Sequence, residues 1–273
     1  MARIFFFLIL LLTPLRLVAQ SSPEFDRLYQ ALHMQDLLEI MREEGMTYGD
    51  EIRDEMFPER GGESWTALVA RIYGTDRMDE VMRTRMREAL AETDLTPLVA
   101  YYTDGPGARV TDLEVSARRA LLAPGAEEAS LEKLQQLRDD ADPRLDLVGR
   151  FIDANDLVDL NLSGALNANY EFYIGLTDGG AFPFEMTEEQ ILADVWSQEA
   201  EIEAETQDWL YSYLAMAYKP LSDAELTGYI DMSETPEGQA LNRALFSAFD
   251  VLYRRISREL GLAAANMIAG EDI

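Results

Sequence analysis

The chain has 273 residues, with 51 acidic against 23 basic side chains and a formal net charge of −28. Such a surface repels phosphate backbones and anionic lipid headgroups, so nucleic acid is a poor partner, while cationic ligands, divalent ions and basic polypeptides remain electrostatically possible. The chain has no cysteine and one histidine, His33, which excludes thiol chemistry and disulfides and nearly excludes histidine-dependent catalysis.

The first residues, MARIFFFLILLLTPLRLVAQ, have the layout of a secretory signal peptide. Arg3 provides a positive start, an apolar run follows from Ile4 to Leu12, and Ala19 is a suitable residue before a cleavage point. The apolar run is much shorter than the ~20 residues that a spanning helix needs. We therefore expect a signal peptide over residues 1–19, a periplasmic or secreted mature protein, and no membrane span after cleavage.

Turn signals separate long segments of helical period, and almost no stretch alternates in the manner of a strand, which predicts an all-α fold. Two segments, residues 187–190 and 222–225, have the sequence of a capping box. Thr96 and Thr235 are N-cap candidates, because each precedes a proline that suits the first helical position.

An internal repeat relates two helix-turn-helix segments. DLTPLVAYYTDGPGARV, residues 94–110, has the same plan as ELTGYIDMSETPEGQAL, residues 225–241. Placing Gly107 on Gly238 aligns Leu95 with Leu226, Thr96 with Thr227, Val99 with Ile230, Val110 with Leu241 and Ala117 with Ala248. Upstream, residues 32–40 resemble residues 152–160. Several matches in the same order indicate a duplication.

We therefore predict two related, bundle-like helical halves, at residues 24–123 and 144–262. Residues 124–143 would join them and contain a short helix, and residues 263–273 would form a C-terminal tail.

The repeated motif also suggests a family. It is carried by Glu225, Leu226, Thr227, Tyr229, Ser233, Pro236, Gly238 and Leu241, and in the first copy by Leu95, Tyr101, Tyr102, Gly107 and Val110. It resembles the bacterial family called domain of unknown function 2059. The resemblance implies an exported, all-helical domain, here in two tandem copies, and it implies no catalytic residues.

The motif has a physical interpretation of its own. Pro236 presets the backbone for a new helix, and Gly238 stands two residues further on, where a glycine costs ~1 kcal/mol relative to alanine. A closely packed second backbone would explain that glycine. The alternative is an anion bound at the helix start, but Glu234 and Glu237 flank the position and would repel it.

One acidic side chain is a weak catalytic candidate. We expect residues 188–218 to form a long acidic helix, and Glu199 falls near the middle of its apolar face. A buried glutamate there could have a raised pKa and act in acid-base chemistry or hold a cation. Alternatively, it marks a kink, pairs with an arginine of the other half, or borders a wet groove. No cofactor motif and no second carboxylate accompany it.

The corresponding helix of the first half is basic where this helix is acidic. Residues 65–90 carry Arg71, Arg77, Arg83, Arg85 and Arg87, so opposite charges on related elements could orient the two halves against each other, and charge reversal of Arg83, Arg85 and Arg87 would test this.

Three functions remain open. We favour a binding or interaction module of the bacterial cell envelope, with a groove between the two halves and an envelope protein or basic polypeptide as partner. The alternatives are a carboxylate-dependent hydrolase that acts on an envelope polymer, with Glu199 as its acid, and an acidic protein that binds divalent cations. The absence of catalytic motifs makes an enzyme the less favoured class.

Overall fold

The computed structural model describes residues 23–58, 60–182 and 186–270, and these residues form helices and no strand, as the sequence predicts. The expected signal peptide lies outside the described residues and stays a prediction. Within the described ranges, no helix has both the length and the apolar composition that crossing a bilayer requires. The helices are α1 (Pro23–Ala31), α2 (Met34–Met56), α3 (Gly62–Ile72), α4 (Thr75–Ala89), α5 (Thr96–Thr103), α6 (Pro106–Leu121), α7 (Ala126–Asp139), α8 (Arg144–Ala154), α9 (Leu157–Asp178), α10 (Glu188–Trp196), α11 (Glu199–Tyr218), α12 (Asp223–Ser233) and α13 (Pro236–Ala269).

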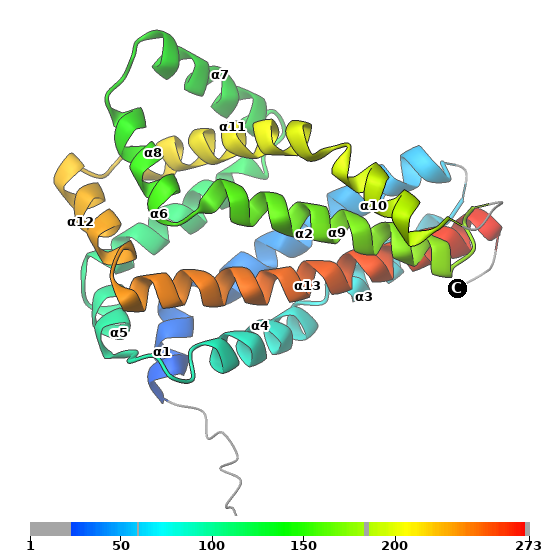
Figure 1. Cartoon of the computed structure of the whole chain (residues 1–273), viewed down its shortest axis with the longest axis horizontal. Coiled ribbons are helices and arrows are strands. Elements are labelled where there is room, and N and C mark those ends of the chain that lie inside the picture. Colours follow the sequence, from blue (N-terminus) through cyan, green and yellow to red (C-terminus); the bar gives the residue numbers. More distant parts are fainter. Residues whose placement is uncertain (1–22, 59, 183–185, 271–273) are drawn as a thin grey trace, which may run out of the picture.

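Helix α13, with 34 residues, runs along the length of the molecule, and α9 lies beside it in the same direction (Figure 1). Two polar contacts between these helices, in the same order along both, show that they run parallel. Near the middle of both helices, the Asn167 amide donates to Asp250 over 2.8 Å, and at the end of α9 Arg258 donates to Asp178 over 2.6 Å. The other face of α13 packs against α4.

Two glycines allow α9 and α13 to approach backbone to backbone. A Cβ atom at Gly175 would collide with the carbonyl oxygen of Arg258 and lie 2.7 Å from the amide nitrogen of Leu262. A Cβ atom at Gly261 would collide with the carbonyl oxygen of Phe172. Because both obstacles are backbone atoms, neither can move aside alone, and the axis separation of the two helices depends on these glycines.

The six helices before α7 and the six after it follow the same order of packing contacts. Helix α1 packs against α5, and α8 packs against α12; α2 contacts α3 and α4, and α9 contacts α10 and α11. Contacts between the two sets are also paired, because α6 packs on α11 while α13 packs on α4. Each set therefore places its last helix on the fourth helix of the other set.

The two sets share an unusual backbone feature at the same place. His33, between α1 and α2, has φ 51°, and Asp156, between α8 and α9, has φ 50°. Both are left-handed conformations that non-glycine residues rarely adopt. His33 also contacts the carboxylates of Asp36 and Asp112, at 3.3 and 3.0 Å.

One hydrophobic core includes side chains of both sets. Its clearest stripe is on α4, where Met78, Met82 and Met86 follow one another at four-residue spacing and are fully buried. A smaller cluster, with Ile191 and Val195 as buried members, lies under α10 on α9. The two sets are therefore held together by a continuous apolar interior.

Element boundaries differ from the sequence expectation in two places. The expected acidic helix is broken, since α10 ends at Trp196 and α11 begins at Glu199. Helix α13 continues past residue 262, the expected end of the second half, to Ala269, and residues 263–265 are buried. The expected joining segment, residues 124–143, contains α7.

Helix starts follow the capping signals with one exception. The two predicted capping boxes are present, with Thr187 and Ser222 as N-caps, and the Thr235 hydroxyl accepts from the Gly238 amide. The expectation for Thr96 is wrong. Leu95 is the N-cap, and the Asp94 carboxylate, one residue before it, accepts from the Thr96 amide over 3.0 Å, so Asp94 and not Thr96 satisfies a free amide of the helix start.

The motif glycines both lie against the preceding helix. A Cβ atom at Gly238 would collide with the carbonyl oxygen of Met232 on α12, and one at Gly107 would lie 2.5 Å from the Tyr101 ring on α5. These positions are where α13 and α6 fold back on the helices before them.

The hypothesis that Arg83, Arg85 and Arg87 orient the two halves is wrong, whereas Arg77 of the same helix does pair with the second half, through Glu259 of α13. Arg83 and Arg87 pair with Asp26 of α1 at 3.4 Å, and their guanidinium groups lie over aromatic rings of the same helix. Arg85 pairs within α4. Arg83 and Arg87 face α1, and all three arginines form their ion pairs within the first half.

We predict that Gly175→Ala destabilises the fold by about 1–3 kcal/mol or more, because the new methyl group must push α9 away from α13. Gly164→Ala is the matched control on the same helix, since a Cβ atom there meets nothing within 4 Å. That change should be neutral or stabilise by up to about 1 kcal/mol. Urea unfolding of both variants measures the difference. Equal midpoints would contradict the close-packing role of Gly175.

Candidate functional site

The described carboxyl group with the most unusual surroundings belongs to Glu114 on α6. Val110 and Ala117 of this helix are buried in the core. Glu114 follows Val110 by four residues and precedes Ala117 by three, so it lies on the same buried face. Its side chain is half-buried.

Tyrosine hydroxyls surround Glu114. Tyr218 of α11 donates to the Glu114 Oε1 atom over 2.6 Å, and Tyr229 of α12 donates to the same atom over 3.2 Å. Tyr213 of α11 donates to the Glu114 backbone carbonyl over 3.0 Å. Residue 114 therefore binds three tyrosines from the second set of helices.

Burial raises the pKa of the Glu114 carboxyl to about 7. The hydrogen bonds from Tyr218 and Tyr229 stabilise the ionised form and oppose this effect, but desolvation outweighs them. No described basic side chain forms an ion pair with it. The group therefore titrates near neutral pH.

The tyrosines themselves stay protonated in this range. Burial, together with the nearby Glu114 charge, raises the pKa of Tyr101 to about 12 and raises the pKa of Tyr102 as well. Burial raises the pKa of Tyr218 and Tyr229 well above their usual range. Only the carboxyl of this cluster changes its charge under ordinary conditions.

Glu171 shows what a cation does to a similar carboxyl group. It is 9 % exposed and lies between α9 and α13. Burial alone would raise its pKa, but Arg254 and Arg258 donate to it over 2.8 and 3.0 Å, and the net pKa is lowered. The difference between Glu171 and Glu114 therefore comes from the presence of guanidinium partners.

Arg118 lies one turn beyond Glu114 and connects three helices. Its guanidinium binds Glu44 of α2 through two hydrogen bonds of 2.7 and 2.8 Å. It also lies 4.8 Å above the ring of Trp209 on α11, which stacks on Tyr213 at 5.0 Å. The side chain thus spans from α2 to α11 across α6.

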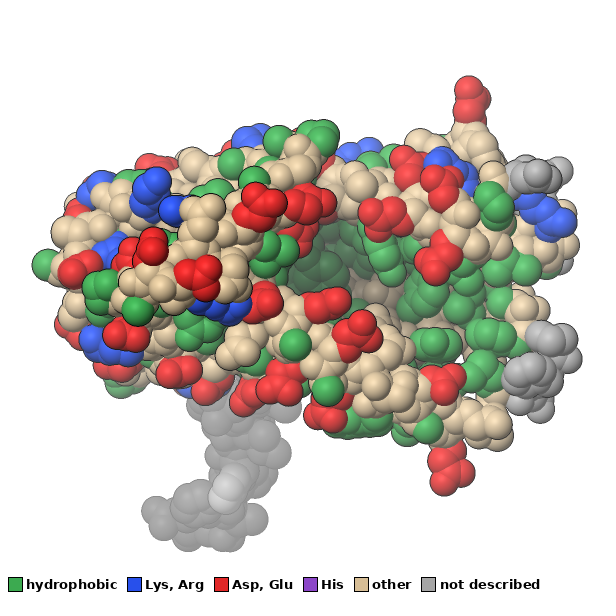
Figure 2. Space-filling view, turned by 90° about the horizontal axis from the view of Figure 1, so that it is seen from above, with side chains coloured by type: hydrophobic (Ala, Val, Ile, Leu, Met, Phe, Trp, Pro, Cys, Tyr) green, Lys and Arg blue, Asp and Glu red, His purple; other side chains and the backbone are tan. Residues whose placement is uncertain are grey.

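The molecule is hollowed on the side where α7, α10 and α11 lie (Figure 2). Hydrophobic side chains are visible inside the hollow, and acidic side chains gather around its edges (Figure 2). We call this feature the groove. Arg118 joins Glu44 of α2 to the ring of Trp209 on α11, and we infer from this bridge that α2 and α11 are its walls. On the α2 wall, Tyr48 is 46 % exposed and lies within electrostatic reach of Glu51 and Glu55. On the α11 wall are the half-buried Trp209 and Tyr213.

The acidic side chains near the groove are not neutralised. Glu199, Glu201, Glu203 and Glu205 of α11 are exposed, and none of them pairs with a basic residue of the described part. Glu199 stands in the first turn of α11 and not within an apolar stripe. The helix break before it puts α11 out of phase with α10, so the face that the sequence suggested does not continue through this residue.

The structure brings two of the sequence-motif residues together at Glu114, because Tyr102 and Tyr229 share a hydrogen bond beside it. Leu95 and Leu226 are buried, Thr227 is half-buried, and Pro236 is exposed at the start of α13. Glu225 completes a capping box with Ser222 and also pairs with Arg109 of α6. These residues shape the fold, and those around Glu114 also build the site.

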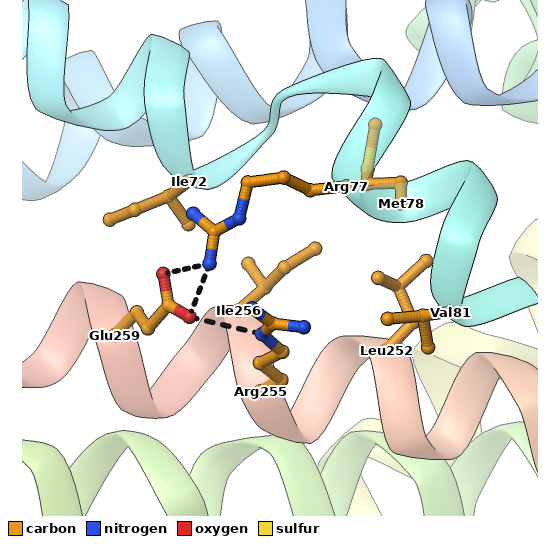
Figure 3. Close-up of a pocket in the computed structure, with 8 residues that line it drawn as sticks. All are labelled: Ile72, Arg77, Met78, Val81, Leu252, Arg255, Ile256 and Glu259. Carbon is orange, nitrogen blue, oxygen red and sulfur yellow. Dashed lines mark hydrogen bonds and ion pairs between the residues drawn. The ribbon is translucent and has the colours of Figure 1, made fainter.

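A small pocket lies between α4 and α13 (Figure 3). Glu259 binds Arg77 of α4 at 2.7 Å and Arg255 of its own helix at 3.1 Å, and the remaining lining is apolar. Both arginines are paired with Glu259, so the lining offers no free carboxylate, histidine or nucleophile. Elsewhere in the described ranges, no three acidic or histidine side chains are grouped as a metal site would need.

Sequence reasoning missed Glu114, although two signals point to it. Its spacing from Val110 and Ala117 places a charge on an apolar face. In the repeat alignment, its counterpart is Leu245. A charged residue aligned with an aliphatic residue on a buried helix face is a signal that the sequence alone provides.

Comparison of the chain with models of known protein families, with curated proteins and with solved structures gives no significant match.

We predict that Glu114 makes the free energy of unfolding fall as pH rises from about 4.5 to about 7. The native state holds this proton more tightly than the unfolded state does, so stability is lost as the carboxyl ionises, by about 3 kcal/mol at most. Glu114→Gln removes the titration and keeps an acceptor for Tyr218. Relative to wild type, the variant should gain thermal stability at pH 8 and little at pH 5.

The control is Glu132→Gln, the same substitution at an exposed glutamate of α7 for which the described part of the structure shows no ion pair. Calorimetric melting at several pH values provides the measurement. A pH dependence that is the same in wild type and in Glu114→Gln would show that Glu114 titrates normally.

Proposed function

We propose that the protein is a binding or interaction module of the bacterial cell envelope, exported by its leader, and that its groove binds a basic segment of a partner polypeptide. The observation that carries this proposal is the hydrophobic hollow with acidic edges (Figure 2). Apolar area would supply binding energy, and the acidic walls would select and orient a cationic partner.

Charge supports this choice of partner. The carboxylates of Glu51, Glu55, Glu201 and Glu205 have no described basic partner, so a bound cationic segment would neutralise them without breaking existing ion pairs. The protein already contains a model of such a contact. Arg118 binds a carboxylate of α2 and the face of Trp209 at once, which is a favourable environment for a guanidinium group.

We also propose that the two sets of helices arose by internal duplication. The matching order of contacts and the shared left-handed residues His33 and Asp156 support this origin. The resemblance of the repeated motif to domain of unknown function 2059 is part of the same proposal. It would make the protein a tandem, exported member of an all-helical class.

A carboxylate-dependent hydrolase is the second candidate function, and one observation favours it. A carboxyl group with a pKa of about 7 can act as a general acid near neutral pH, and this group is Glu114, not the exposed Glu199. Glycoside hydrolysis would need a second, free carboxylate close by, and the nearby Glu44 is bound to Arg118. Loss of turnover of an envelope polymer in Glu114→Gln, with folding intact, would support this alternative.

Site-specific photocrosslinking in the native envelope tests the interaction module. We predict that a photoreactive phenylalanine analogue at Tyr48, in the groove, captures one defined protein. The same analogue at exposed Glu127 on α7 should not capture it. Capture of the same product from both positions, or of none from Tyr48, would contradict binding in the groove.

Charge reversal tests the electrostatic part separately. A 20-residue amphipathic helix of leucine and lysine is a suitable probe for titration calorimetry. Glu51→Lys with Glu55→Lys should weaken its binding by about tenfold or more at low salt, because long-range attraction is lost on one wall. Glu127→Lys with Glu128→Lys makes the same charge change on α7 and should have a much smaller effect. Equal losses would indicate nonspecific attraction to an acidic surface.

A further inference from the structure

Glu114 connects the two sets of helices. It is on α6, whereas Tyr213 and Tyr218 are on α11 and Tyr229 is on α12. Its side chain and its carbonyl together accept all three hydroxyls. These hydrogen bonds therefore lie across the packing contacts of α6 with α11 and α12.

The groups that face Glu114 from the packed elements are mostly neutral. They are Tyr101 and Tyr102 of α5, Tyr213 and Tyr218 of α11, and Tyr229 of α12. The nearest charged pair is Arg118 with Glu44, which acts on Tyr213 and whose charges are matched to each other. A proton on the carboxyl thus gives a neutral, hydrogen-bonded cluster, and its loss leaves an uncompensated charge.

We propose that the Glu114 carboxyl is a proton-operated latch that holds α11 and α12 on α6 when protonated and releases them when ionised. An ionised carboxylate gains more from water than from this cluster of tyrosines. Opening of the contact between α6 and α11 admits water. The protonated group favours the closed arrangement, in which Tyr218 and Tyr229 donate to it.

The latch acts on one wall of the groove. Tyr213 binds the Glu114 carbonyl and stacks on Trp209, and Trp209 contacts Arg118, whose carboxylate partner is on α2. Loosening of α11 at Glu114 therefore changes the spacing of α11 from α2. This consequence for binding rests on the proposed function of the groove, whereas the latch itself does not.

Hydrogen exchange of the intact protein, followed by mass spectrometry and corrected for the intrinsic exchange rate, tests the latch. The opening equilibrium constant for peptides covering residues 210–218 and 223–233 should rise about tenfold between pH 6 and pH 8 in wild type. This rise is expected because the pKa of the Glu114 carboxyl is about 7 in the closed arrangement and has its ordinary value in the open one. Glu114→Gln should abolish this rise, and Glu132→Gln at an exposed position of α7 should preserve it.

Tyr218→Phe provides a second variant with the opposite expectation. It removes a hydrogen bond that stabilises the ionised carboxylate, so the rise between pH 6 and pH 8 should become steeper than in wild type. Equal pH dependence of opening in wild type and Glu114→Gln, or an unchanged slope in Tyr218→Phe, would overturn the latch.

Binding of the leucine-lysine helix at pH 6 and pH 8 separates the latch from the proposed function. A dissociation constant that changes with pH in wild type but not in Glu114→Gln supports both. If opening depends on pH but the probe does not bind at either pH, the latch is supported and the proposed groove ligand is contradicted. Binding with the same pH dependence in both proteins contradicts the coupling of the latch to the groove.

Discussion

The structure depends on the contact between α9 and α13, where Gly175 and Gly261 let two helix backbones meet without intervening side chains. Close approach brings Glu171 within reach of Arg254 and Arg258, so the carboxylate is neutralised where it is buried. The contact also holds α13 in position to pack against α4, and so joins the second set of helices to the first. A small change in the spacing of these two helices would alter packing, charge pairing and the arrangement of the two sets together.

Charge balance explains much of the remaining architecture. With 23 basic against 51 acidic side chains, most carboxylates have no guanidinium or ammonium partner. Several basic residues join two helices that are distant in the sequence, as with Arg118 on Glu44 and Arg77 on Glu259. Glu114 is a partly buried carboxyl without such a partner, and proton uptake is the remaining way to neutralise it. The raised pKa of Glu114 thus follows from the lack of a basic partner as much as from burial.

The all-α class and a few helix starts could be predicted, because they depend on residues close together in the sequence. Ser222 and Thr235 cap their helices through neighbours three residues away. The pairing of Arg83 and Arg87 with Asp26 could not be predicted, since α1 reaches these arginines only through the tertiary fold. Helical spacing points to Glu114 on an apolar face, but its tyrosine partners are 99 to 115 residues away in the chain. Glu199 was misplaced because a two-residue break changes the phase of everything after it.

The exchange of packing partners has a consequence for how the chain could be divided. Helix α6 packs on α11 and α13 packs on α4, so each set of helices covers an apolar face of the other. Cutting the backbone within α7 would therefore not release two independent domains. The two fragments would each expose the face that the other normally covers, and they would be expected to reassociate as a complementing pair, much as two subunits of a pseudosymmetric dimer do.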